Sequence, residues 1–174
     1  MKQMSIITLL IFICIPKSTL AANISEYIHP GVRGGAGTDG GELAATLAIT
    51  LGKIKQIPII VHLDIDKKSL FGFSQTSYLT GLRFPVNRSP FFLDLGFGYT
   101  TGKIGCFLCL GDTNSNFEGN YNGISLNATL YLHFSRHFGL YTNAYHFKAL
   151  EKSGINSDSF SKQGGISGGI SLLF

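Results

Sequence analysis

Apolar residues recur at every second position through most of the chain, and this period limits the fold it can adopt. Successive side chains of a β-strand point to opposite faces, so sustained alternation predicts strands with one apolar face. Six segments show the pattern clearly: 43–52, 59–66, 78–86, 91–99, 124–134 and 166–174. In the second of them, Ile, Val, Leu and Ile at odd positions alternate with Ile, His, Asp and Asp. The chain is therefore predicted to be all-β.

Two weaker segments complete the set of strands. Residues 26–37 alternate less regularly, and in residues 138–149 the apolar side chains change face part of the way along. A β-bulge near Thr142–Asn143 would reconcile the two halves of the latter segment, because one extra residue reverses the alternation. The sequence thus predicts eight strands of about ten residues each, the length that a transmembrane β-strand needs.

The expected connections differ in length between the two ends of the strands. Every second one is tight: 53–57, 87–90 and 135–137. The others are 38–41, 67–75, 101–120 and 150–163, of which three are long and polar. An even number of strands with short turns at one end and longer loops at the other is typical of an antiparallel, up-and-down transmembrane β-barrel.

Alternation alone does not separate a membrane barrel from a soluble one, but the composition of the two faces does. The less apolar face carries Gly, Ser, Thr, Asn and a few charges, and only 14% of all residues are charged. A solvated exterior would be richer in Lys and Glu. Aromatic residues also gather at the expected strand ends, as interfacial girdles do. They are Phe84, Phe91, Phe134, Phe138 and Phe174 beside the short turns, and Tyr78, Tyr99 and Tyr121 beside the longer loops.

The first residues have the pattern of a secretory signal peptide. Lys2 precedes an apolar run from Ile6 to Ile15, and Thr19-Leu20-Ala21 offers a cleavage site after Ala21. The run is too short for a transmembrane helix, which needs about 20 residues. We expect residues 1–21 to be the signal peptide and 22–174 the barrel domain. The mature domain then has twelve basic and ten acidic residues, with no basic run that would favour nucleic-acid binding.

The C-terminal residues carry a resemblance to a known family. Ser167, Gly169, Leu172 and the terminal Phe174 occupy the fixed places of the C-terminal assembly signal of bacterial outer-membrane proteins. The mature chain resembles the small eight-stranded outer-membrane barrels of the OmpA/OmpX type. The resemblance implies location in the bacterial outer membrane, insertion by the outer-membrane assembly machinery, both termini in the periplasm, and a monomer as the usual state. It implies no single activity, because this fold hosts several functions.

The polar face of the predicted barrel carries ionisable groups that should lie in its lumen: Arg33, Glu42, His62, Asp64, Asp66, Arg83, Asp94 and His133. Eight strands leave little more room than side chains fill, so these charges must pair with one another. If residues 87–90 form the turn, Arg83 lies directly opposite Asp94 on the neighbouring strand. The sequence predicts a buried, two-pronged ion pair between them that plugs the lumen.

Motifs that could carry other chemistry are weak. Eight-stranded enzymes that deacylate lipid A have a His-x-Ser motif near the end of the seventh strand, but here Lys148 follows His146 where the serine nucleophile should be. The formal G-x-G-x-x-G from Gly35 to Gly40 lies between two predicted strands, which favours a hairpin over a nucleotide site. The histidines show no metal-ligand spacing. We expect no enzyme activity, no cofactor and no metal.

Cys106 and Cys109 form a Cys-x-x-Cys motif in the longest predicted loop. Zinc would need two further ligands, and no His or Cys lies close by along the chain. An exported chain meets an oxidising compartment, so we predict a small disulfide between these cysteines. Thiol labelling of native mature protein without reductant should find no free thiol. A count of two would contradict the prediction.

The same loop suggests how the protein acts. Ile104, Phe107, Leu108 and Leu110 would form an apolar patch on an otherwise polar external surface. This favours a surface interaction protein that contacts lipopolysaccharide, a host molecule or another envelope protein. A narrow pore and a soluble periplasmic barrel that binds a ligand are the alternatives. Lipids of the outer membrane are expected partners in any case.

Overall fold

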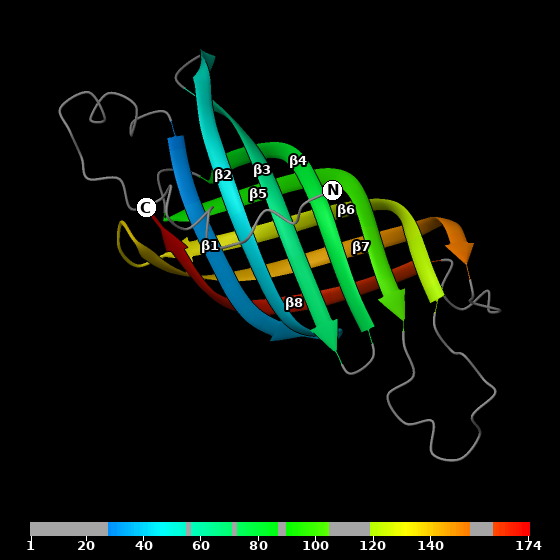
Figure 1. Ribbon diagram of the computed structural model, residues 1–174. Coiled ribbons are helices and arrows are strands. Elements are labelled where there is room, and N and C mark those ends of the chain that lie inside the picture. Colours follow the sequence, from blue (N-terminus) through cyan, green and yellow to red (C-terminus); the bar gives the residue numbers. More distant parts are fainter. Residues whose placement is uncertain (1–27, 55–56, 71–72, 87–89, 105–118, 154–161) are drawn as a thin grey trace.

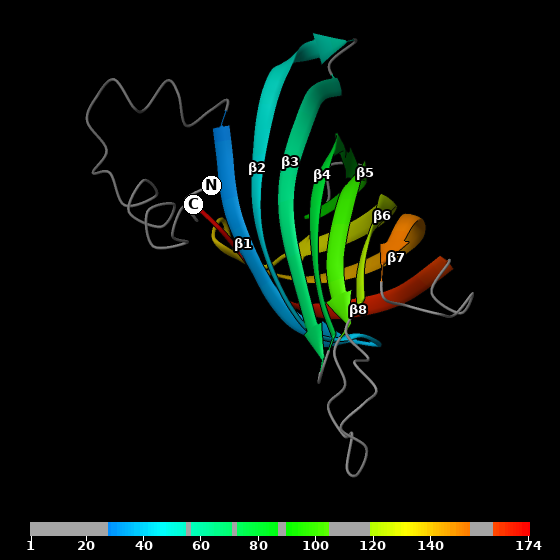
Figure 2. The same cartoon turned by 45° about the vertical axis from the view of Figure 1, so that its right-hand side comes forward.

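The computed structural model describes residues 28–54, 57–70, 73–86, 90–104, 119–153 and 162–174. The elements are β1 (Ile28–Gly37), β2 (Gly40–Ile54), β3 (Ile57–Leu70), β4 (Phe73–Val86), β5 (Phe91–Ile104), β6 (Gly119–His133), β7 (Phe138–Ser153) and β8 (Lys162–Leu173). Each strand pairs with the next one antiparallel, and β1 pairs with β8 to close a barrel (Figures 1 and 2). The predicted fold class is confirmed. The expected signal peptide lies outside the described residues.

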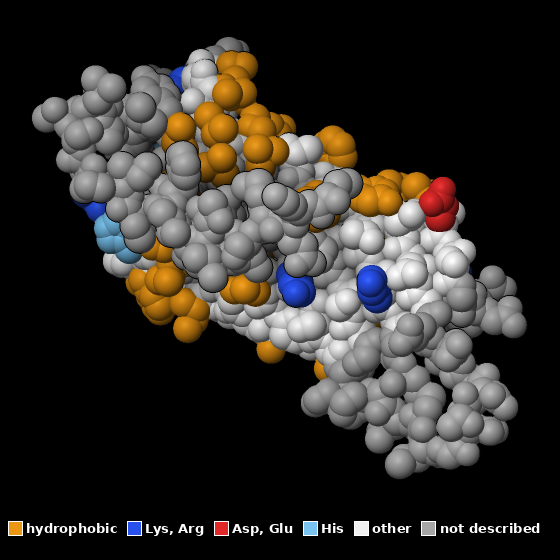
Figure 3. All heavy atoms as spheres, in the orientation of Figure 1, with side chains coloured by type: hydrophobic (Ala, Val, Ile, Leu, Met, Phe, Trp, Pro, Cys, Tyr) orange, Lys and Arg blue, Asp and Glu red, His pale blue; other side chains and the backbone are white. Residues whose placement is uncertain are grey.

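The barrel is apolar outside and polar inside. On β3, His62, Asp64 and Asp66 are at most 3% exposed, whereas Leu63 and Ile65 between them are 49% and 47% exposed. The same arrangement recurs on β2, β5 and β6, and Figure 3 shows hydrophobic side chains spread over the outside of the half nearer to the start of β1. An exterior of this kind is stable only in contact with lipid, because so large an apolar surface is rare in water. No helix in the described part of the chain is long and apolar enough to cross a membrane.

The bulge expected near Thr142–Asn143 is absent, and that prediction was wrong. β7 alternates without interruption from Phe138 to Lys148, with Tyr141, Tyr145 and Phe147 pointing inward. The sequence misled because aromatic side chains were assumed to face lipid, whereas this lumen accepts them. The irregularity of β7 lies further on: Ala149 pairs with Gly123 and Glu151 with Asn122, which leaves Leu150 as the extra residue.

The strands are longer than predicted at the end that carries the longer connections. Residues 67–75 were expected to be a loop, but they belong to β3 and β4, with only residues 71–72 between the two strands. The other two long connections shorten to 105–118 and 154–161. The outward residues at these strand ends, such as Lys67, Ser69 and Ser74, are polar, so the apolar alternation that marks the other strands in the sequence is lost there.

The outward aromatic residues form the two expected girdles with one exception. Phe84, Phe134, Phe138 and Phe174 are 40–61% exposed at one end. Tyr78 and Tyr99 face each other across β4 and β5 and are 51% and 48% exposed. Tyr121 was assigned to the second girdle, but it is 3% exposed and points into the lumen, so that assignment was wrong.

The formal G-x-G-x-x-G motif forms the β1–β2 hairpin, as the sequence predicted. Gly37 ends β1 and Gly40 begins β2 with a φ of +96°, a conformation that side chains disfavour. Gly35 serves the closure of the barrel: a Cβ placed there would lie 2.2 Å from the carbonyl oxygen of Gly168 on β8. The glycines of this segment are therefore explained by backbone geometry and need no nucleotide.

The four residues of the assembly signal are divided between the two faces of the barrel wall at the C-terminus. Ser167 is buried at 5% exposure, whereas Leu172 and Phe174 face outward at 39% and 53%. The backbone N–H of Phe174 donates to the carbonyl of Pro30 at 2.9 Å, so the last residue still joins the ladder with the start of the chain.

We predict that Phe174→Ala lowers the amount of assembled barrel without blocking export. The substitution removes an exposed ring and leaves the backbone bond to Pro30 in place, so the folded barrel itself should tolerate it. Immunoblots of unheated membrane samples measure the folded fraction. Leu173→Ala, at the preceding residue that ends β8, is the control. Wild-type levels of folded Phe174→Ala protein in the outer membrane would contradict the assembly-signal interpretation.

Candidate functional site: the charged lumen

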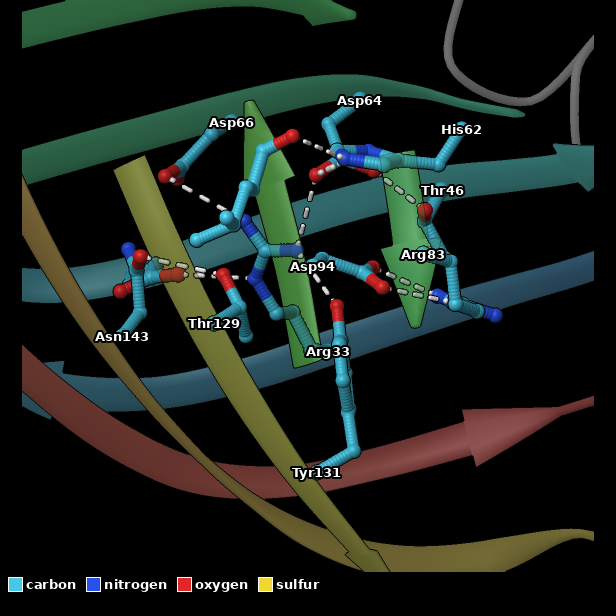
Figure 4. A network of polar contacts seen from close by, with 12 residues as sticks. Arg33, Thr46, His62, Asp64, Asp66, Arg83, Asp94, Thr129, Tyr131 and Asn143 are labelled. Atoms are coloured by element: carbon cyan, nitrogen blue, oxygen red, sulfur yellow. Dashed lines mark hydrogen bonds and ion pairs between the residues drawn. The ribbon is translucent and has the colours of Figure 1, made fainter. Parts of the chain in front are cut away.

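The polar residues predicted to line the lumen converge inside the closed barrel. Arg33, Glu42, His62, Asp64 and Asp66 are all 5% exposed or less, and His133 is half-buried near the end of β6. The first five come from the consecutive strands β1, β2 and β3, whereas His133 comes from β6, which the closure of the barrel places across the lumen. Figure 4 shows Arg33, His62, Asp64 and Asp66 in a network of polar contacts, with Thr46, Arg83, Asp94 and Tyr131 beside them.

Arg33 is the centre of this network. Its Nε donates to Glu42 Oε1 at 3.0 Å, and its Nη1 donates to Asp64 Oδ2 at 3.3 Å. Its Nη2 lies 3.5 Å from Asp66 Oδ2. Nη1 also donates to the hydroxyl of Tyr131 at 2.9 Å. One guanidinium thus contacts three carboxylates whose side chains are at most 3% exposed.

Neighbouring hydroxyls and a histidine hold the carboxylates in place. The Thr46 hydroxyl donates to Asp64, and the Ser167 hydroxyl donates to Glu42. His62 Nδ1 lies 3.4 Å from Asp64 Oδ2. Buried carboxylates need such partners, because each lone pair left unsatisfied in the interior is destabilising. The network therefore connects β1, β2, β3, β6 and β8 through side chains.

Arg83 and Asp94 form the pair expected from the register. They are directly opposed on β4 and β5, and Arg83 Nε and Nη2 donate to the two oxygens of Asp94 at 2.8 Å each. Asp94 is 0% exposed and Arg83 5%. The guanidinium of Arg83 also lies 5.2 Å from the ring centroid of Tyr131. Tyr131 therefore contacts both arginines and joins the two ion-pair groups.

Beyond Arg33, toward the end with the longer connections, the lumen becomes aromatic. Tyr121, Tyr145 and Phe147 form a buried cluster against which Phe73 and Ile104 pack. Lys68 belongs to the same region: its ammonium lies 3.2 Å from the ring centroid of Tyr145 and 4.0 Å from Asp66 Oδ2. The sequence did not reveal this cluster. Only the register of β6 and β7, which places Tyr121, Tyr145 and Phe147 inward, could have shown it.

Of the external apolar patch expected on residues 104–110, the structure describes Ile104. Ile104 ends β5 and packs inside the barrel against the aromatic cluster, so placing it in an exposed loop was wrong. Phe107, Leu108, Leu110 and both cysteines of the predicted disulfide lie outside the described residues.

His62, Asp64 and Asp94 could offer one ligand atom each within 4.8 Å of one another, which is the spacing of a metal site. Their surroundings do not suit a cation. Asp64 is bonded to Arg33 and Asp94 to Arg83, so a metal would have to displace two guanidinium groups that already neutralise these carboxylates. The three residues are better understood as part of the ion-pair network.

His146 and Lys148 do not belong to the lumen. Both are exposed on the outer face of β7, beside Leu126 and Ile124 of β6. No serine or threonine stands at either position, and the neighbouring outward residue on β8 is Gly164, which pairs with His146.

Comparisons with known proteins agree on the fold. No protein-family model and no curated protein matches the chain. Among solved structures, the N-terminal β-barrel domain of Pseudomonas aeruginosa OprF is similar with a TM-score of 0.54 and 11% identity, over 84% of this chain and 96% of that one. Ail, the attachment invasion locus protein of Yersinia pestis, has a TM-score of 0.49 and 14% identity, over 85% and 97% of the two chains.

The likeness to the OprF domain concerns the fold and not the activity. The membrane location of the protein follows from its own surface. A closed barrel with a polar, ion-paired interior and an apolar exterior is stable in a lipid bilayer and not in water. The chain therefore has the fold of the small eight-stranded outer-membrane β-barrels and is an integral protein of the bacterial outer membrane.

Proposed function

We propose that the protein is a non-catalytic surface interaction protein. In this proposal the barrel is a rigid anchor, the end away from the start of β1 and the end of β8 faces the outside of the cell, and the segments 105–118 and 154–161 contact the partner. The partner is lipopolysaccharide, a host molecule or another envelope protein.

The filled lumen is the observation that carries the proposal. Arg33, Asp64, Asp94 and His62 are at most 2% exposed, and Arg33 on β1 reaches across the interior to Asp64 on β3 and to Tyr131 on β6. A lumen occupied in this way leaves a partner only the two ends of the barrel and its outer wall. The connections at the outer end are also the longest in the chain, with fourteen residues between β5 and β6. Loops of this length on a rigid scaffold commonly carry function.

Loop replacement tests the proposal. Residues 106–110 are replaced by an equal number of Gly and Ser residues, a second variant replaces residues 155–159 of the other segment in the same way, and Lys53→Gln at the opposite end of the barrel is the control. Bacteria that display each variant are tested for adhesion to cultured epithelial cells and for binding to immobilised lipopolysaccharide. We expect the first replacement to reduce one of these activities to background while unheated samples still migrate as folded barrel. Unchanged binding in both assays would contradict the role given to this segment.

A narrow pore is the second candidate, and conductance separates it from the first. Purified protein in planar lipid bilayers should show no discrete conductance steps, because ion pairs occupy the middle of the lumen. Reproducible steps from homogeneous protein would favour the pore.

Incubation with lipid A should likewise release no fatty acid, since nothing beside His146 supplies a serine nucleophile.

A further inference from the structure

The closed barrel places charges of both signs in its lumen, where Arg33, Lys68 and Arg83 lie beside the carboxylates, but nearly all charges on its outer wall are positive. Four acidic residues, Glu42, Asp64, Asp66 and Asp94, point inward and are at most 5% exposed. Four lysines, Lys53, Lys67, Lys103 and Lys148, point outward and are exposed. Glu151 is the one acidic residue on the outer wall of the described strands, and it accepts a hydrogen bond from Asn122. The nearly neutral composition of the sequence therefore conceals a positive outer wall.

Two of these lysines flank a polar patch whose layout follows from the register. Tyr78 on β4 is paired with Tyr99 on β5. Two residues nearer to the end with the longer connections, Thr76 is paired with Thr101. Beyond that, Ser74 is paired with Lys103, while Lys67 on β3 lies beside Thr76. All these side chains point outward, since they alternate with the buried Gln75, Ser77 and Thr100. We call Lys67, Ser74, Thr76, Thr101 and Lys103 the lysine–hydroxyl patch.

The two lysines of the patch can act on the same group. Lys67 lies on β3 and Lys103 on β5, with β4 between them. Across this sheet Lys67 is level with Thr101, which is two residues from Lys103. With strands about 4.8 Å apart and a rise of about 3.3 Å per residue, their Cα atoms are separated by roughly 12 Å. Both side chains are long enough to bring their ammonium groups together above Ser74 and Thr76 of the strand between them. Within the described residues no acidic side chain pairs with either lysine.

The position of the patch relative to the membrane is given by the tyrosines. Tyrosine rings collect at the level of lipid headgroups, with the ring against apolar chains and the hydroxyl in the polar layer. Leu82, Leu95 and Phe97 lie on the side of Tyr78 and Tyr99 nearer to the middle of the barrel wall, and the lysine–hydroxyl patch lies on the other side. In Figure 3 the hydrophobic exterior gives way toward this end to polar surface with isolated Lys or Arg side chains. The patch is therefore at headgroup height.

We propose that the lysine–hydroxyl patch binds the phosphate group of an anionic lipid in the leaflet that surrounds the outer end of the barrel. The ammonium groups of Lys67 and Lys103 neutralise the phosphate, and the hydroxyls of Ser74, Thr76 and Thr101 donate to its oxygens. The aromatic pair below packs against the first part of the acyl chains. This site lies on the barrel wall and is separate from the segments that the proposed function assigns to a partner.

Binding to lipids that differ only in phosphate tests the site. Refolded full-length mature protein in octyl glucoside micelles is titrated with diphosphorylated lipid A and with its dephosphorylated form, and tyrosine fluorescence is followed. We expect the phosphorylated lipid to bind about tenfold more tightly or better, since each lysine near an anionic surface adds on the order of 1 kcal/mol. Lys67→Gln/Lys103→Gln should abolish that preference, and Lys67→Arg/Lys103→Arg should retain it.

Matched lysines keep the test specific. Lys53→Gln removes an exposed lysine at the opposite end of the barrel, and Lys148→Gln removes an outward lysine on β7, away from the patch. Both should preserve the preference for the phosphorylated lipid. Equal affinity for the two lipids, or an equal loss in Lys148→Gln, would overturn the proposal. Inorganic pyrophosphate distinguishes the source: binding as tight as that of lipid A would assign the patch to a soluble phosphorylated ligand and overturn the lipid assignment.

Discussion

Replacing Arg33 by methionine should destabilise the folded barrel by about 5 kcal/mol, the upper end of the range for breaking a buried ion pair. Arg33 is 1% exposed and faces the carboxylates of Glu42, Asp64 and Asp66 at 3.0, 3.3 and 3.5 Å. Its loss leaves three acidic groups in a closed interior, where Lys68 at 4.0 Å from Asp66 is the next cation. The remaining carboxylates are at most 5% exposed, so they repel one another in an interior of low dielectric constant.

Urea unfolding of the protein refolded in lipid vesicles measures this effect through the fraction that migrates as folded barrel in unheated gels. Lys53→Met, at an exposed lysine on β2, is the matched control and should change the free energy of unfolding by no more than about 0.5 kcal/mol. A loss of less than about 1 kcal/mol for Arg33→Met would show that Arg33 does not hold the network together.

The Arg83–Asp94 pair should show strong coupling in a double-mutant cycle. Arg83→Met and Asp94→Leu should each destabilise the barrel by about 3–5 kcal/mol, because each leaves the partner charge buried and unpaired. The double variant should be less destabilised than the sum of the two, and less than either single change if the apolar side chains pack well. The reason is the geometry: two hydrogen bonds of 2.8 Å join groups that are 5% and 0% exposed.

The same vesicle unfolding assay provides all four free energies of the cycle. Thr129→Val/Asn143→Leu is a useful comparison, since these residues form a buried but uncharged pair across β6 and β7 at 3.1 Å. Its coupling should be much smaller, because neutral hydrogen bonds contribute about 1 kcal/mol. Additive effects at Arg83 and Asp94 would show that the ion pair is not the interaction that stabilises this part of the lumen.

The Arg83–Asp94 pair could be predicted because it depends on local information. A short turn after Val86 fixes the register of two neighbouring strands, and alternation decides which side chains face inward. Arg33 could be placed in the lumen by the same reasoning, but its central role could not be foreseen. Glu42 and Asp64 approach it from the consecutive strands β2 and β3, but Tyr131 comes from β6, and only the closure of the barrel brings it to Arg33.

The errors have a common physical origin. Tyr121 and Phe147 are aromatic but point inward, and Lys67 and Ser74 are polar but stand in strands. Alternation predicts an apolar outer face only where lipid surrounds the wall, and a polar inner face only where charges fill the lumen. Toward the end with the longer connections the outward side chains become polar and the inward ones aromatic, so hydropathy no longer indicates the face or even the strand.

Membrane fractionation tests the central claim most directly, namely that this chain is a lipid-embedded barrel with a closed, ion-paired interior. Cells that produce the protein are lysed without detergent and separated into periplasmic, inner-membrane and outer-membrane fractions. The account predicts that the protein is recovered in the outer-membrane fraction, is released only by detergent, and migrates differently with and without heating. Recovery of folded protein in the soluble periplasmic fraction would contradict it, because the side chains assigned to lipid would then have to face water.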